Sequence, residues 1–145
     1  MIHRYFLFYT VLLFLSLFGC TSKEAEKKHA KRSYIAIDGT DTAWLKVLIT
    51  DARFKGKLEI NFNNRYKDSG DVKGDVKGDT LLGDYHYFHY GLEWKRKAIS
   101  LLKKNNTLVM GEGLQRVYLE IPFFSAEVPI KYDSVKFVFR LVDAP

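Results

Sequence analysis

Apolar and polar residues alternate with a period of two along most of the chain from Ser33 onward. Phe54, Leu58, Ile60 and Phe62 are separated by charged or amide residues, and the run 71–78 alternates Asp and Lys with Val and Gly. Near the end, residues 135–142 place apolar side chains at every second position. Alternation of this kind is typical of β-strands with one buried and one solvated face.

Turn-forming residues such as Asp-Gly, Asn-Asn and Ser-Gly separate these runs at short, regular intervals, as in hairpins of a β-meander. Beyond the N-terminal segment we find no helical stripe. Pro122 and Pro129 bracket a segment that we interpret as an edge strand or a bent connection. The predicted strands are 34–37, 44–50, 54–63, 71–77, 80–88, 93–103, 107–114, 117–121 and 134–142.

The expected fold is all-β, a single antiparallel meander that closes into a barrel of about eight strands. An open sheet with this many strands would leave two unprotected edges. A sandwich is the competing architecture. Sandwiches usually need long connections between distant strands, whereas most connections here are short, so we favour the barrel.

The first residues have a different pattern. Residues 1–4 carry a positive charge, residues 5–18 are apolar, and the only cysteine of the chain follows at Cys20. A charged start, an apolar middle and a small residue before the cleavage point are typical of a secretory signal peptide. The apolar stretch is shorter than the approximately 20 residues that a membrane span needs.

Leu17, Gly19 and Cys20 resemble the lipobox of bacterial lipoproteins, although Phe18 is bulkier than the usual residue there. The resemblance implies that residues 1–19, a signal helix, are removed and that Cys20 carries a covalent lipid such as palmitate. Residues 20–32 would then be a polar, basic tether and residues 33–145 the barrel domain. Thr21 lacks the acidic character associated with inner-membrane retention, so the resemblance places the protein in the cell envelope, anchored to the outer membrane.

Two later stretches, 69–85 and 98–113, resemble segments of small outer-membrane lipoproteins with lipocalin-like barrels. Together with the lipobox they extend over most of the chain in the same order. The resemblance implies a lipocalin-like barrel. It does not assign a ligand, because a shared fold does not by itself define chemistry.

Charge excludes one class of partner. The net charge is +6, but residues 23–32 hold five cations and two anions and Arg4 adds another positive charge, which leaves +2 for residues 33–145. Nucleic-acid-binding domains place their clustered cations on the domain itself. We therefore expect no nucleic-acid partner.

The stretch 85–90, Tyr-His-Tyr-Phe-His-Tyr, has the most unusual local composition. In a regular strand Tyr85, Tyr87 and His89 face one side and His86 faces the other, so the two histidines point apart. We name as candidate ligand-binding residues Tyr85, Tyr87, His89, Phe62 and Ile60. The alternative is that these rings fill the barrel.

We expect no metal site and no catalysis. Asp71, Asp75 and Asp79 are separated by Lys73 and Lys77, an arrangement that suits a solvated face better than a calcium site. The motifs of serine hydrolases and zinc proteases do not occur in the sequence, and its single cysteine is the one expected to be acylated. No cofactor other than the lipid on Cys20 is expected.

Two functions remain. In the first, the barrel of a lipid-anchored envelope protein binds a small apolar or amphipathic molecule. In the second, the barrel is filled and serves as a structural or protein-partner-binding module of the envelope. A cavity of about 300 Å³ or more would favour the first, and a filled barrel with an exposed apolar patch would favour the second.

Overall fold

The computed structural model describes residues 30–142, in which eight strands form a closed antiparallel barrel. The predicted signal peptide 1–19, Cys20 and most of the tether 20–32 lie outside the described residues. The strands are β1 (Arg32–Asp38), β2 (Asp41–Ile49), β3 (Arg53–Phe62), β4 (Tyr66–Lys77), β5 (Thr80–His89), β6 (Glu93–Lys104), β7 (Thr107–Met110), β8 (Gln115–Tyr118), β9 (Ile121–Phe124) and β10 (Val138–Val142).

The order around the barrel is β1-β10-β7-β6-β5-β4-β3-β2. Strands β1 to β7 therefore form a simple meander, and β10 closes it by pairing with both β1 and β7. Closure leaves no open edge along the paired positions, which is the physical reason for preferring a barrel to an open sheet. The prediction of an antiparallel meander barrel is confirmed, and the architecture is compatible with a lipocalin-like barrel.

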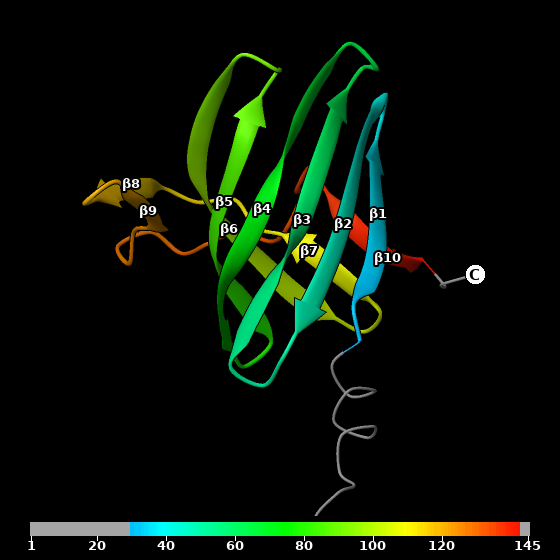
Figure 1. The fold of residues 1–145 in the computed structure, drawn as a ribbon. Helices are drawn as coiled ribbons and strands as arrows, with labels where there is room; N and C mark the ends of the chain where they lie inside the picture. The colour runs from blue at the N-terminus through cyan, green and yellow to red at the C-terminus, as the bar shows by residue number, and fades with distance from the viewer. Residues whose placement is uncertain (1–29, 143–145) are drawn as a thin grey trace, which may run out of the picture.

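The barrel has two distinct ends (Figure 1). The turns β1–β2, β3–β4 and β5–β6 lie at one end, which we call the mouth, and the turns β2–β3, β4–β5 and β6–β7 lie at the other, which we call the base. Strand β1 begins at the base. Any site at the mouth is therefore at the far end of the barrel from the start of β1.

Alternating residues of the strands fill the interior. The largest fully buried side chains include Tyr85, Phe139, Leu45, Leu58 and Ile60. The charged residues at 71, 73 and 75 face outward and are exposed, as their alternation predicts. Because one face of each strand is apolar, a slip of the register by one residue would move that face into water.

Glycines allow the strands to pack closely where the sheet bends. Gly74 of β4 lies directly opposite Gly83 of β5. A Cβ atom on Gly74 would lie 2.1 Å from the carbonyl oxygen of Leu82, and one on Gly83 would lie 1.9 Å from that of Lys73. These glycines therefore permit close backbone approach and strong bending and do not create free space.

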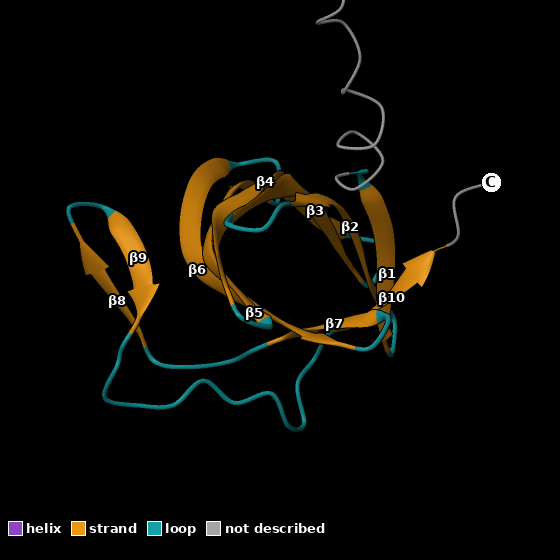
Figure 2. Ribbon diagram, turned by 90° about the horizontal axis from the view of Figure 1, so that it is seen from below, coloured by secondary structure: helices purple, strands orange, loops and turns teal. Residues whose placement is uncertain are grey.

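The segment 111–137 leaves the barrel between β7 and β10, and it carries the separate hairpin β8–β9 (Figure 2). The prediction of one strand over 117–121 is wrong. Leu119 and Glu120 have φ angles of 47° and 62° and form the turn between β8 and β9. Two successive positive φ values are typical of a tight hairpin turn.

Candidate ligand site at the barrel mouth

Part of the barrel wall is missing on the mouth side of β6. Strand β7 pairs only with residues 101–104 of β6, and β10 pairs with β1 only over residues 33–35. The half of β6 nearer the mouth therefore has a barrel strand on one side only, with β5. Residues 111–113 and 115 and residues 136–137 lie beside this opening.

A hollow of about 280 Å³ lies at this opening, which is slightly below the size of about 300 Å³ at which small-molecule sites begin. Most of its lining is apolar. Two lysines, Lys97 and Lys136, supply cationic groups, and the exposed residue Glu112 supplies a carboxylate. The apolar lining side chains come from β3, β6, β7 and the approach to β10: Ile60, Phe62, Ile99, Met110 and Phe137.

Lys97 points into the barrel. It pairs with Tyr85 of β5, whose neighbour on β4 is Val72, and both of those side chains are buried. The Nζ atom of Lys97 lies 5.6 Å from the ring centroid of Tyr85 and 5.4 Å from that of Tyr87. Aromatic faces attract a cation at this range, but more weakly than a carboxylate does.

Among residues 30–142, no carboxylate oxygen lies within 4.0 Å of the Lys97 ammonium. Burial lowers the pKa of Lys97 below its ordinary value. The more distant charge of Asp68 raises this pKa and that of Lys136 lowers it further. Lys97 is thus a half-buried cation at a mainly apolar hollow, without an ionic partner in the described part of the chain.

Lys136 lies at the same hollow but is neutralised. Its Nζ atom donates a hydrogen bond of 2.6 Å to Oδ2 of Asp41, and it lies 5.3 Å and 5.4 Å from the ring centroids of Phe62 and Phe137. The hydrogen bond from Lys136 holds the pKa of Asp41 below its ordinary value. Of the two lysines, only Lys136 therefore has a carboxylate partner among residues 30–142.

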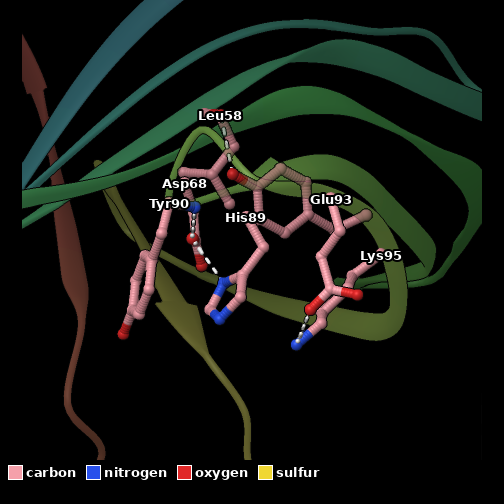
Figure 3. A network of polar contacts seen from close by, with 7 residues as sticks. Leu58, Asp68, His89, Tyr90, Glu93 and Lys95 are labelled. Carbon is pink, nitrogen blue, oxygen red and sulfur yellow. Dashed lines mark hydrogen bonds and ion pairs between the residues drawn. The ribbon is translucent and has the colours of Figure 1, made fainter.

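A polar network lies next to the hollow at the mouth (Figure 3). Asp68 is 2% exposed, and its Oδ1 accepts a hydrogen bond of 2.7 Å from Nδ1 of His89 and one of 3.4 Å from the backbone N–H of Tyr90. The imidazole of His89 also stacks on the Tyr90 ring at 3.8 Å. Glu93 and Lys95 form a separate pair of 2.8 Å beside it. The carboxylates of this network are thus already engaged.

The structure separates the five candidate residues. Ile60 and Phe62 line the hollow. Tyr85 is completely buried and donates a hydrogen bond of 3.0 Å to the Leu58 carbonyl, and Tyr87 stacks on it at 4.4 Å, so these two rings fill the core. His89 belongs to the network with Asp68.

Lys97, Lys136, Met110 and Phe137 also line the hollow and are not among the candidate residues predicted from the sequence. The position of Lys97 could have been predicted from the sequence, because on a regular strand it shares a face with Ile99 and Leu101. Both of these side chains are buried in the structure. His86 faces away from His89, as the alternation predicts. Its ring centroid lies 4.8 Å from that of Trp94 on the outer face. Within residues 30–142, side chains of His, Cys, Asp and Glu do not gather in threes in an arrangement that could hold a metal ion.

A larger hollow, of about 860 Å³, lies outside the barrel between β4–β5 and the segment 121–130. One wall is largely apolar, and the other carries charged residues such as Lys73, Asp75 and Asp84. We call it the outer groove.

No helix long and apolar enough to cross a bilayer occurs within residues 30–142.

Comparisons with family models, with curated proteins and with solved structures give no match to this chain. The class that the fold defines is a small closed antiparallel β-barrel with a hollow at its mouth. The lipoprotein resemblance stays a prediction.

Proposed function

We propose that this protein is an envelope protein, lipid-anchored through Cys20 and held at the outer membrane, whose barrel binds a small amphipathic molecule at the mouth. The observation that carries the binding proposal is the lining of the mouth hollow, in which apolar side chains from β3, β6, β7 and the approach to β10 lie with the charged residues Lys97, Lys136 and Glu112. The volume of about 280 Å³ is slightly below the value of about 300 Å³ that favours ligand binding, so the proposal rests on this lining and not on the volume. Concave, mostly apolar sites with a few polar groups are typical of small-molecule binding.

The interior limits the size of the ligand. Tyr85, Phe139 and Leu45 fill the centre of the barrel, so a bound molecule would occupy only the opening near β6 and not the whole lumen. A short acyl or isoprenoid tail suits this space. Its polar head would lie near the lysines.

Titration with the neutral apolar fluorophore N-phenyl-1-naphthylamine tests the proposal. The chain from residue 21 is used, because it lacks the acylated cysteine and keeps every strand of the barrel. We expect saturable binding that Phe62→Ala weakens. Phe88→Ala is the matched control, because Phe88 is exposed and lies on the outer face of β5. Absence of saturable binding in the folded wild-type chain would overturn the proposal.

A second function is supported by a different observation. Hairpin β8–β9 stands beside the barrel and exposes Val117, Tyr118 and Leu119 at 69%, 69% and 77% of their surface. Contiguous exposed apolar side chains are typical of protein-interaction surfaces. We propose as the alternative that an extended apolar segment of another envelope protein docks against these exposed side chains of hairpin β8–β9.

Photo-crosslinking in cells tests this alternative. A photoreactive amino acid at Leu119 should give one discrete adduct with an envelope protein, and the same group at Asn106, in the β6–β7 turn, should not. Equal labelling from both positions, or none from Leu119, would count against the alternative.

A further inference from the structure

Lys97 is a charge that lacks a counter-ion within the described residues. Other charged side chains near the mouth already have partners: Lys95 pairs with Glu93, Lys136 pairs with Asp41, and the carboxylate of Asp68 accepts a hydrogen bond from His89. A partly buried ammonium without an anion is costly, because protein replaces the water that would solvate it. The two tyrosine rings beneath Lys97 compensate only part of this loss.

We propose that the mouth hollow selects amphiphiles with a singly charged anionic head, a carboxylate, which Lys97 binds. The proposal rests on the proposed function and specifies the ligand class of the same site. In this arrangement the carboxylate accepts hydrogen bonds from the Lys97 ammonium. The tail lies against the apolar wall formed by Ile60, Phe62 and Met110.

The charges favour one negative charge over two. Lys136 is the other cation of the lining, and Asp41 already neutralises it through a hydrogen bond of 2.6 Å. Glu112 also lines the hollow, but it is exposed and its carboxylate forms no ion pair with Lys97 within 4.0 Å. At most one unit of positive charge is therefore available. A carboxylate balances it, whereas a doubly charged phosphate monoester would leave a negative charge in a largely apolar site.

A neutral head would be bound less well. An alcohol of the same length would place an equal tail on the apolar wall but leave Lys97 without a counter-charge. Hydrogen bonds to charged groups contribute more than those between neutral groups. The discrimination should therefore depend on the Lys97 ammonium and not on the tail.

Competition against bound N-phenyl-1-naphthylamine tests the inference, since this neutral probe reports the hollow without requiring Lys97. Decanoate, decanol and decyl phosphate compete in parallel with the chain from residue 21. We expect decanoate to compete at least about tenfold better than decanol. Decyl phosphate should compete less well than decanoate.

Lys97→Met keeps most of the apolar stem and removes the charge. The ratio of the two competition constants does not depend on the affinity for the probe, so we expect Lys97→Met to reduce the preference for decanoate over decanol to less than about twofold, whereas Lys97→Arg should keep the preference. Lys46→Met is the matched control, because Lys46 is an exposed lysine of β2, and it should behave as the wild type does.

The outcomes separate the two claims. Probe binding with equal competition by decanoate and decanol would overturn the anionic selectivity and leave the proposed function standing. A preference for decyl phosphate would replace the carboxylate by a phosphate head and so overturn the inference as stated. Failure of the wild-type chain to bind any of these molecules would overturn both claims. The comparison of the three competitors uses the wild-type chain alone, so its result does not depend on whether a variant folds.

Discussion

The side-chain amide of Gln115 pairs with the backbone of Ala98 as a neighbouring strand would. Its Oε1 accepts a hydrogen bond of 2.9 Å from the Ala98 N–H, and its Nε2 donates one of 3.3 Å to the Ala98 carbonyl. Both bonds lie where β6 has no barrel strand on that side. One residue of the long excursion thus satisfies the edge of β6 beside the hollow.

This relationship predicts that Gln115→Leu destabilises the protein. Loss of the amide leaves the Ala98 N–H and carbonyl without these partners, and we expect the free energy of unfolding to fall by about 1–2 kcal/mol. Urea denaturation followed by circular dichroism measures this. Arg116→Met is the control, since Arg116 faces solvent in an exposed ion pair with Glu127 and should cost less than about 1 kcal/mol. Equal effects of the two variants would contradict the role given to Gln115.

Tyr87→Ala should behave as a core truncation. Tyr87 is 7% exposed and stacks on Tyr85, so we expect a loss of about 3–5 kcal/mol in the free energy of unfolding. Phe88→Ala, on the outer face of the same strand, should cost much less. A loss below about 1 kcal/mol for Tyr87→Ala would mean that Tyr87 lines free space and does not fill the core.

A charge placed in the barrel core should unfold it. Phe139→Asp buries a carboxylate at a position that is 0% exposed in the native barrel, with no partner provided for it. Lys57→Asp, on the exposed face of β3, removes only the exposed pair with Asp71 and should leave a folded barrel. Circular dichroism and thermal unfolding of both variants make the comparison. A cooperative thermal transition in Phe139→Asp would contradict the packed core.

Alkaline pH should destabilise the barrel through Tyr85. Burial, followed by the charges of Asp68, Tyr87 and Glu59, raises the pKa of Tyr85 above its ordinary value of 10.0. In the unfolded chain the phenol ionises near pH 10 while the folded one stays protonated, so its contribution to stability is complete below about pH 10 and is lost as the pH rises further.

Unfolding free energies measured between pH 9 and pH 11.5 test this effect. The wild type should lose stability with pH more steeply than Tyr85→Phe above about pH 10, with one group contributing at most about 1.4 kcal/mol per pH unit. The shifts of Tyr87 and Lys97 are common to both proteins and largely cancel in the comparison. Parallel pH profiles would show that Tyr85 is not protected from ionisation.

The anchor is tested by Cys20→Ser. Two or more acyl chains hold a protein stably at a membrane, so the loss of the acylated thiol should move the protein to the soluble fraction. Fractionation of cells that express the two forms measures this. If Cys20→Ser remained in the membrane fraction as fully as the wild type, the anchor proposal would be wrong.

The architecture could be predicted because its signals are local. Alternation along β3 and along residues 71–77 of β4 shows which face is buried, and turn residues such as Asp38-Gly39 and Asn105-Asn106 mark the hairpins. The signal fails where a residue breaks the pattern. Leu119 and Glu120 adopt positive φ angles without a glycine or asparagine, so the residue pattern predicts a continuous strand where the β8–β9 turn lies. Asp68-Ser69-Gly70 has the composition of a turn and predicts a strand that starts at residue 71, whereas Asp68 is buried and β4 begins at Tyr66.

The hollow could be predicted only in part, because it depends on contacts between distant residues. The pair Lys136–Asp41 joins residues that are 95 positions apart, and the missing wall beside β6 follows from how few residues β7 and β10 contribute to pairing. Alternation does not report such distances. It could have placed Lys97 inside the barrel, but not beside Phe137 at an opening in the sheet.

The most direct test of the account is a map of where decanoate binds. Methyl resonances of isoleucine and methionine in the chain from residue 21 can be followed by NMR during a decanoate titration. We predict saturable shifts at Ile60, Ile99 and Met110, which line the hollow, with Ile37 on the exposed β1–β2 side as an internal control. Shifts confined to Ile121 and Ile130 of the outer groove, or no saturable shifts, would contradict binding at the barrel mouth.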